Sequence, residues 1–504
     1  MPKLNLFAHQ LKGIEFLIQR EGAGLFWEMG VGKSRTALSA ARTFFERKGR
    51  ARIDRVLILS PASVKFAWLE ELRKLSSESA SFDCNIVAYK DLKFYCLEVL
   101  GALNGNPSSH LPIAIISYSL LQQERHAAKI ASWCSAGRTI LICDESSYLK
   151  NRTAKQTKGT KIVAEACVYR WLLSGTPVTN SPLDLWAQAE VMYPLERGKG
   201  PLYGFSNWYA FRSAFAELSL RRAGSHSFTE IVGYKNLDKL QTRFSKFVSR
   251  IEKRDCLDLP AKSYTVREIA LSKETWKIYN ELKKDCLVTL GDGETKPEPN
   301  AAVRLLRLSQ ITSGHYGGGT IGSGLPEVEG EELINHDISS EKLSWLVEAI
   351  VEGELSSTKA LIVWCRWRRE RERLAELLRA KGHPFEEIYG GQSERARNAA
   401  ITNFQTSKGI PFALLAQPHA GGFGLNLTIA STAIYLSNDY SWAIRAQSED
   451  RMLRTGQTNP CLYIDVVATG PEGQKTVDSA ILEALKEKQD LATWTCEKWR
   501  KALE

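Results

Sequence analysis

The sequence predicts an α/β protein with two parallel-sheet lobes and helical insertions. Three observations lead to this fold class. The chain has 504 residues, more than one ordinary core accommodates, and 43% of them are hydrophobic. Short apolar runs alternate with helix-forming segments in both halves, as expected of parallel strands joined by crossover helices. A glycine-rich loop and an acidic pair follow two of these runs, at the ends of strands where open α/β sheets bind ligands.

The first lobe is expected over residues 1–250. Its clearest strands are four apolar runs at 56–59, 113–116, 140–142 and 171–173. After Pro194 the sequence becomes aromatic and basic, and a helix is indicated by the spacing of Leu237, Leu240, Phe244 and Phe247. We therefore expect a helical insertion over about residues 195–250.

The second lobe is expected over residues 251–504. It contains an insertion over about residues 267–340, with helical stretches near 272–286 and 301–309. A loop over 313–332 has 7 glycines and no following Lys-Ser, which favours a flexible connector over a phosphate-binding loop. The clearest strands of this lobe are 360–364, 412–415 and 433–436.

A phosphate-binding loop is predicted over residues 28–34, which read Glu-Met-Gly-Val-Gly-Lys-Ser between an apolar stretch and a helix former. Its glycines let backbone N–H groups surround phosphate oxygens without a side-chain clash. Lys33 can reach the β- and γ-phosphates, and the Ser34 hydroxyl can ligate Mg²⁺. The strict pattern has a glycine where Trp27 stands, so a simple glycine turn is the alternative.

An acidic pair, Asp144 and Glu145, follows the apolar run 138–143. Asp144 can hold Mg²⁺ through water, and Glu145 can take a proton from an attacking water. Two surface acids in a turn are the alternative, which the upstream phosphate loop disfavours. Loop and pair together predict that the chain binds and hydrolyses a nucleoside triphosphate.

Bulk properties narrow the class of protein. A net charge of +10 and a pI near 9.0 favour a polyanionic partner such as nucleic acid. The 10 cysteines have neither Cys-x-x-Cys nor zinc spacing, so they are expected to be reduced core residues of an intracellular protein. No apolar run approaches the ~18 residues of a membrane span, and the start of the chain lacks a signal peptide. No membrane partner is therefore expected.

The order of the motifs resembles the Swi/Snf-type ATPases of helicase superfamily two over nearly the whole chain. The first half carries Phe7-Ala8-His9-Gln10, Ser60-Pro61-Ala62-Ser63, Ser117-Tyr118, Asp144-Glu145-Ser146-Ser147 and Leu173-Ser174-Gly175-Thr176-Pro177. The second half carries a linker over 250–260 and motifs over 389–393, 420–427 and 447–457. The last of these, Gln-Ser-Glu-Asp-Arg-Met-Leu-Arg-Thr-Gly-Gln, is the most specific. The resemblance implies two RecA-like lobes of the P-loop NTPase class.

Two departures from the family pattern affect the expected function. Ser147 replaces the histidine of the DEAH-type box, which can rewire its linkage to the Leu173–Pro177 motif. Residues 310–314 stand where many relatives carry Cys-x-His-Pro. The chain looks like a more distant branch that includes fork-remodelling enzymes, so nucleosome sliding is less expected.

The resemblance also implies which residues form the nucleotide site. Catalysis is assigned to Lys33, Glu145, Arg451 and Arg454. The nucleotide contacts are Gln10, Met29, Gly30, Val31, Gly32, Lys33, Ser34, Arg35, Asp144, Gly424 and Gln447. The cofactors are ATP and Mg²⁺, with Ser34 and Asp144 as metal ligands. Arg451 and Arg454 lie three residues apart, so on a helix they share a face and can stabilise charge on the γ-phosphate. A salt-bridged surface helix is the alternative.

Contacts to DNA are implied by the same motifs. They are Ser63, Lys65, Ser117, Lys150, Arg152, Gly421, Gly422 and Trp442. Most should reach phosphates, because a motor cannot depend on base sequence. For Trp442 a core position is nearly as well supported. The basic run over 366–373 is better explained as a solvated helix start with Glu–Arg pairs than as a DNA patch.

The expected function is an ATP-dependent translocase on duplex DNA, which strips proteins, anneals strands or remodels forks. Branched or single-stranded DNA remains open as a substrate. Strand-separating helicase activity on DNA or RNA is the alternative, although the sequence shows no wedge domain. A nucleotide-gated scaffold that barely turns over is a third reading. We expect a monomer in the cytoplasm of a bacterial or phage-infected cell, or in the nucleus of a eukaryote, with an unidentified targeting protein left open.

Overall fold

The computed structural model divides the chain into two compact units. The described residues are 6–47, 52–77, 82–89, 94–101, 110–179, 181–194, 198–223, 226–291, 299–317, 335–407, 412–421, 425–487 and 489. The first unit includes residues 1–219 and 229–258, and the second unit includes 220–228 and 259–489. The limits expected for the two lobes, 1–250 and 251–504, stay a prediction.

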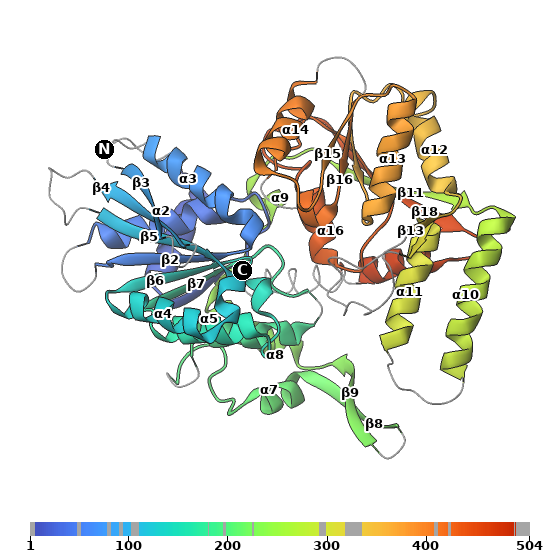
Figure 1. Cartoon of the computed structure of the whole chain (residues 1–504). Helices are drawn as coiled ribbons and strands as arrows, with labels where there is room; N and C mark the ends of the chain where they lie inside the picture. Colours follow the sequence, from blue (N-terminus) through green and yellow to red (C-terminus); the bar gives the residue numbers. More distant parts are fainter. Residues whose placement is uncertain are drawn as a thin grey trace. The chain divides into compact units, whose positions relative to one another are not determined.

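The first unit is built on an eight-stranded sheet with the order β10-β1-β7-β6-β2-β5-β4-β3. The strands from β7 to β3 are labelled in Figure 1. Six neighbouring strands are parallel: β10 (Val248–Ser249), β1 (Gly22–Leu25), β7 (Tyr169–Leu173), β6 (Thr139–Asp144), β2 (Arg55–Ser60) and β5 (His110–Ser117). Two antiparallel strands, β4 (Phe94–Gly101) and β3 (Phe82–Tyr89), extend it. The four strands predicted from apolar runs are confirmed by β2, β5, β6 and β7.

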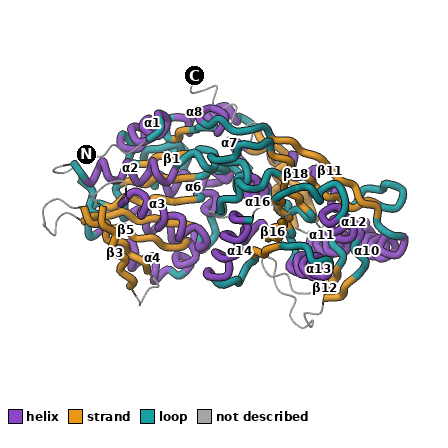
Figure 2. The backbone as a smooth tube through the Cα atoms, turned by 90° about the horizontal axis from the view of Figure 1, so that it is seen from above, coloured by secondary structure: helices purple, strands orange, loops and turns teal. Residues whose placement is uncertain are grey.

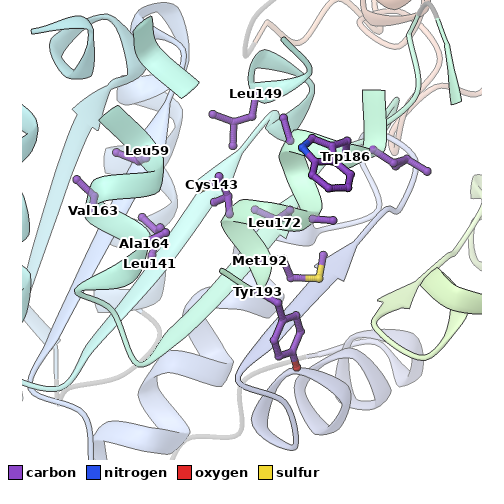
Figure 3. Packing of buried hydrophobic residues seen from close by; sticks show 14 of the residues in the cluster. Leu59, Leu141, Cys143, Leu149, Val163, Ala164, Leu172, Trp186, Met192 and Tyr193 are labelled. Atoms are coloured by element: carbon purple, nitrogen blue, oxygen red, sulfur yellow. The ribbon is translucent and has the colours of Figure 1, made fainter. Parts of the chain in front are cut away.

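Alternate residues of these strands supply two separate cores. In β2, Leu57 and Leu59 belong to one core, whereas Val56 and Ile58 belong to the other. Because successive strand side chains point to opposite faces, a continuous apolar run is what a sheet covered on both faces requires. Figure 3 shows the first of these cores, where Leu59 and other strand residues meet side chains of neighbouring helices.

The helices of this unit fall into two groups according to the core that they join. One core receives α1 (Ala8–Ile18), α2 (Lys33–Phe45) and α3 (Lys65–Ser77). The other receives α4 (Glu124–Ser135), α5 (Lys155–Glu165) and α6 (Leu185–Met192). The helix predicted directly after the glycine-rich loop is confirmed by α2.

The segment after residue 198 is not purely helical. It contains α7 (Trp208–Phe215), β8 (Ala216–Ala223), β9 (His226–Tyr234) and α8 (Leu237–Ser245). The helix predicted from the spacing of Leu237, Leu240 and Phe244 is confirmed by α8, whereas Phe247, also included in that prediction, lies beyond its end at Ser245. Strands β8 and β9 form a two-stranded sheet that the sequence did not predict, because most of their residues are exposed and give no apolar pattern.

The second unit is built on a six-stranded, fully parallel sheet with the order β11-β18-β17-β14-β16-β15. Its strands are β11 (Lys262–Ala270), β14 (Ala360–Trp364), β15 (Phe385–Ile388), β16 (Phe412–Ala416), β17 (Thr432–Tyr435) and β18 (Cys461–Thr469). The three strands predicted here are confirmed by β14, β16 and β17.

Helices accompany the strands of this sheet too (Figure 2). They are α10 (Lys273–Gly291), α11 (Pro299–Thr312), α12 (Glu341–Val351), α13 (Arg368–Ala380), α14 (Glu394–Thr406), α15 (Pro418–Gly421) and α16 (Trp442–Glu449). The two predicted helical stretches are confirmed by α10 and α11. Most of the predicted glycine-rich loop lies outside the described residues, and its start pairs as β12 (His315–Gly317) with β13 (Asn335–Asp337). None of the described helices is long and apolar enough to cross a membrane.

Candidate nucleotide site and strand contacts

The glycine-rich loop leaves β1 and enters α2, as predicted. Gly30 and Gly32 have φ angles of 79° and 89°, a left-handed backbone that favours glycine. A Cβ atom on Gly32 would lie 2.1 Å from Nε2 of Gln10, so the loop also has no room for a side chain there. Helix α2 begins at Lys33, which puts the helix N-terminus directly behind the loop, a favourable place for an anion.

Neighbouring groups hold the loop in this conformation. The ammonium of Lys33 donates to the carbonyls of Trp27 (2.9 Å) and Glu28 (3.1 Å), so it already lies along the inside of the loop. The hydroxyl of Thr36 donates to the carbonyl of Gly32 (3.0 Å). His9 Nε2 lies 3.0 Å from the carbonyl of Val31. These contacts keep a phosphate-sized turn of backbone with a buried cation beside it.

Gln10, predicted as a nucleotide contact, lies buried in the first turn of α1 and next to the loop. Its Oε1 accepts a hydrogen bond from the backbone N–H of Phe7 (3.0 Å). The ring of Phe7 is exposed and stacks on His9 at a centroid distance of 5.6 Å. The amide and the exposed ring together offer both a polar edge and an apolar face to a base.

The acidic pair lies at the carboxyl end of β6, as predicted. Oδ2 of Asp144 accepts a hydrogen bond from the indole N–H of Trp68 (2.7 Å), and Oδ1 accepts one from the N–H of Glu145 (3.0 Å). The hydroxyl of Tyr118 donates to the carbonyl of Asp144 (2.7 Å). Burial raises the pKa of Asp144, and the bond from Trp68, the charge of Lys33 and the N–H of Glu145 oppose that rise.

These contacts also test whether Asp144 suits a magnesium ion. Each carboxylate oxygen of Asp144 accepts one of these hydrogen bonds, and an oxygen of this kind has a further lone pair for water or metal. Hard oxygen ligands are those that Mg²⁺ prefers, and Mg²⁺ usually keeps several waters. The residues present therefore fit the predicted water-mediated contact from Asp144, with the Ser34 hydroxyl at the start of α2 as the second ligand.

Glu145 has an unusual backbone. Its φ and ψ are 49° and 55°, a left-handed conformation that is rare for a residue with a side chain. Such a conformation costs about 1–3 kcal/mol and persists only where the surroundings enforce it. It lies between β6 and the short helix η6 (Ser146–Leu149), and Glu145 is buried. Strain at a buried acid beside a phosphate loop is typical of a functional residue.

A buried polar bridge joins the acidic turn to the Leu173–Pro177 segment. The hydroxyl of Ser146 donates to Oε1 of Gln188 on α6 (2.8 Å). Nε2 of Gln188 donates to the carbonyls of Pro177 (2.7 Å) and Asp184 (3.1 Å). The linkage between these two segments runs through Ser146, whereas the rewiring expected at its neighbour Ser147 stays a prediction. Sequence reasoning missed Gln188.

Two residues after β10 hold the other end of the loop. Nη1 of Arg250 donates to the carbonyls of Phe26 (2.6 Å) and Gly175 (3.3 Å). The carboxylate of Glu28 accepts the backbone N–H of Lys253 (2.5 Å), which begins α9 (Lys253–Cys256). The segment that resembles the family linker therefore packs directly against the phosphate loop.

Several predicted DNA contacts of the first unit lie at or after the carboxyl ends of sheet strands. Ser117 ends β5 and pairs in register with Ser60, the last residue of β2. Lys65 begins α3, and burial lowers its pKa. Nζ of Lys150 donates to the hydroxyl of Thr179 (3.0 Å). The side chain of Ser63 is outside the described residues, although its backbone belongs to the short helix η2 (62–64).

The predicted residues of the second unit have mixed outcomes. Helix α16 ends at Glu449, so the prediction that Arg451 and Arg454 share a helix face is wrong. The chain turns there because the N–H of Leu427 bonds to the carbonyl of Arg451 (3.0 Å), which draws this segment onto a neighbouring loop. Nη1 of Arg454 donates to the carbonyl of Leu425 (3.0 Å), and burial lowers its pKa.

The alternative of a salt-bridged surface helix does not describe this region either. Glu449 is buried and binds Arg445 (2.8 Å) within α16. Gln447 is buried in the same helix, and Trp442 packs partly against a hydrophobic cluster. Gly421 ends α15, whereas Gly422 and Gly424 lie outside the described residues.

The basic run over 366–373 begins the helix α13 and forms Glu–Arg pairs, as predicted, but it is not solvated throughout, because Glu370 and Arg371 are buried. Arg368 forms an i,i+4 ion pair with Glu372 (2.7 Å), and Arg369 binds Glu376 (3.1 Å). Arg369 also binds Asp337 on β13 (2.5 Å). These arginines are therefore engaged within the second unit.

Comparisons with known proteins agree with this architecture. The family model for the SNF2-related domain matches residues 9–313, and the model for the helicase conserved C-terminal domain matches residues 341–456. An uncharacterised ATP-dependent helicase of Mycoplasma genitalium is 23% identical over 97% of this chain and 42% of its own length. The DNA repair and recombination protein RAD54B of Gallus gallus is 25% identical over 97% of this chain and 54% of its own length.

Two further matches have lower coverage or similarity. An ISWI chromatin-remodeling complex ATPase of Arabidopsis thaliana is 23% identical over 89% of this chain and 39% of its own length. The SWI2/SNF2 ATPase core of Sulfolobus solfataricus, solved in complex with dsDNA, has a TM-score of 0.40 and 21% identity, with coverage of 98% of this chain and 95% of that one. The chain thus spans between 39% and 54% of the length of these three curated relatives.

Proposed function

Because the chain belongs to the SNF2-related family, we propose that it hydrolyses ATP while it moves along duplex DNA. The observation that carries this proposal is the arrangement at the edge of the first sheet. A glycine loop with the buried ammonium of Lys33 lies there, together with a strained acid, Glu145, that directly follows Asp144 at the end of β6. This combination suits phosphate binding and attack by water.

Each residue of this arrangement has a distinct role in the proposed reaction. The amides of Gly30 to Ser34 bind phosphate oxygens, and Lys33 neutralises part of their charge. Ser34 and Asp144 would hold Mg²⁺, which supplies further positive charge to the phosphates when bound. Glu145 takes the proton from the attacking water. The roles of Arg451 and Arg454 at the γ-phosphate stay a prediction.

Duplex DNA as the track is supported by charge and by the relatives. The chain carries a net charge of +10. Its relatives include a DNA repair and recombination protein and a chromatin-remodeling ATPase, although the chain spans only part of each. We propose sequence-independent phosphate contacts from Ser63, Lys65, Ser117, Lys150 and Arg152, because a moving protein must bind every step of the track alike.

Strand separation is the second candidate function, and one observation favours it. On the strands β8 and β9, Leu220 and Val232 are 68% and 55% exposed. Apolar side chains that enter a duplex can unstack neighbouring bases. A strand-displacement assay with a forked duplex would separate the two functions, because a translocase on duplex DNA hydrolyses ATP without releasing a strand.

The proposed function is tested by ATP hydrolysis with duplex DNA, single-stranded DNA, RNA or no nucleic acid. We expect the largest stimulation with duplex DNA. Lys33→Ala should abolish turnover, and Glu145→Gln should keep ATP binding but stop hydrolysis. Glu165→Gln, the same exchange at an exposed position of α5, is the matched control and should hydrolyse ATP normally.

Two results would contradict the proposal. One is a Glu145→Gln protein that hydrolyses ATP at the rate of the unmodified chain. The other is an unmodified chain whose ATP turnover does not rise when any nucleic acid is added.

A further inference from the structure

Two segments of the first unit carry positive charges without any acidic residue. From residue 146 to 164 there are five Lys or Arg residues and no Asp or Glu. From residue 198 to 216, which includes all of α7, Lys199 and Arg212 occur, again with no acid. Segments of this kind attract polyanions when they lie together on a surface.

Aromatic side chains bring these two segments together. The guanidinium carbon of Arg152 lies 5.4 Å from the ring centroid of Trp208 and 5.8 Å from that of Tyr209. The guanidinium carbon of Arg212 lies 5.6 Å from the same Tyr209 ring. Two cations therefore flank one tyrosine that is 61% exposed. We call Arg152, Tyr209 and Arg212 the arginine–tyrosine patch.

The patch is built on a firmly packed helix. The side chain of Asn207 caps α7 by accepting the N–H of Ala210 (3.1 Å). Trp208 contacts Trp186 of α6 edge-to-face at a centroid distance of 5.9 Å, and Phe211 is fully buried in the core. The positions of Tyr209 and Arg212 are thus set by the fold and not only by their own flexible side chains.

No carboxylate neutralises the patch. Among the described residues, neither Arg152 nor Arg212 forms an ion pair with an acid. Lys155 and Lys158 are exposed nearby in the sequence, on the first turns of α5, and they too have no acidic partner within the described part of the chain. Cations collected without an acid repel one another unless an external anion binds between them.

We propose that the arginine–tyrosine patch binds the phosphate backbone of the duplex, with Arg212 as a contact that the family motifs do not contain. The inference rests on the proposed function, which supplies the duplex. It is favoured because Arg152 lies only seven residues after Glu145 in the sequence, on the segment that leads from the acidic turn into α5. A planar guanidinium can pair with a phosphate through two parallel hydrogen bonds, and this geometry makes arginine well suited to the anion.

The test is the salt dependence of duplex binding, measured by fluorescence anisotropy between about 50 and 200 mM salt. Each lost phosphate contact lowers the slope of log K against log salt by about 0.9. Arg212→Gln should therefore reduce the slope by about 1 and weaken binding at every DNA sequence alike. Arg152→Gln, in the same patch but outside α7, provides a second test that does not depend on correct packing of that helix.

Arg243→Gln is the matched control. Its guanidinium lies 4.8 Å from the ring of Phe205 and donates to the carbonyl of Tyr203 (2.7 Å), so it already has a partner within the chain. For Arg243→Gln, the slope of log K against log salt should equal that of the unmodified chain. If Arg212→Gln and Arg152→Gln also keep that slope, the patch does not bind DNA, even though the unmodified chain responds to duplex. Failure of the proposed function would look different, because then the unmodified chain would show no DNA-stimulated hydrolysis at all.

Discussion

Replacement of Gln188 by leucine tests the buried bridge behind the acidic turn. Gln188 and Ser146 are both fully buried, and the amide accepts from Ser146 at 2.8 Å and donates to the carbonyl of Pro177 at 2.7 Å. Leucine fills a similar volume but leaves the hydroxyl and the carbonyl without these partners. Each stranded buried group costs about 1–3 kcal/mol.

The expected loss of stability follows from these two groups. Because leucine also removes the cost of burying an amide, we expect the free energy of unfolding to fall by about 2–4 kcal/mol. In a unit of this size that corresponds to a fall in Tm of roughly 5–15 °C. Calorimetry and urea unfolding of the full chain would measure it.

Ser146→Ala completes a double-mutant cycle with Gln188→Leu. Each single change leaves the other side chain, or the group it bonded, without its hydrogen-bond partner. The loss in free energy of unfolding of the double variant should therefore be smaller than the sum of the two single losses, by about 1 kcal/mol. ATP turnover should fall more than ATP affinity, because Ser146 directly follows Glu145 whereas the Lys33 loop is untouched. Additive stability changes, or a loss below about 0.5 kcal/mol for Gln188→Leu, would refute the reasoning.

Three further predictions concern single side chains. Trp68→Phe removes the hydrogen bond to the Asp144 carboxylate, so the pKa of Asp144 should rise further. ATP hydrolysis should then require a higher Mg²⁺ concentration, and the acid limb of its pH profile should shift to higher pH. Gly32→Ala should abolish nucleotide binding in a fluorescent-ATP assay, because the added methyl group meets Gln10 and the backbone is left-handed; normal binding would contradict the loop geometry. Burial raises the pKa of Glu370 to about 7, so between about pH 4.5 and 7 the folded state binds more protons than the unfolded state. The free energy of unfolding should therefore fall by about 3 kcal/mol as the pH rises across that range. Glu370→Gln should remove this fall when unfolding is measured against pH, and an unchanged profile would exclude Glu370 as its origin.

The sequence predicted those features that depend on a local requirement. Positions of left-handed backbone favour glycine, so Gly30 and Gly32 indicate where the loop turns. Strands covered on both faces need continuous apolar residues, which made β2 and β6 visible. The acidic pair was recognisable because it directly follows such a strand.

Features that depend on distant contacts were not predictable in this way. The strands β11 and β15 lie at the edges of the second sheet, where partial exposure removes the continuous apolar run. Gln188 is an ordinary polar residue on a helix until its partner, 42 positions earlier, lies beside it. The turn after α16 is set by a bond to Leu427, and no local pattern around Arg451 indicates it.

The left-handed backbone at Glu145 has a consequence for attempts to improve this protein. Glycine adopts that conformation without a steric penalty, so a selection for heat resistance alone would reward its appearance at position 145. If Glu145 is the proton acceptor that we propose, such a variant would be more stable but would not hydrolyse ATP. Selection for thermal stability and selection for ATP hydrolysis therefore favour different residues at position 145.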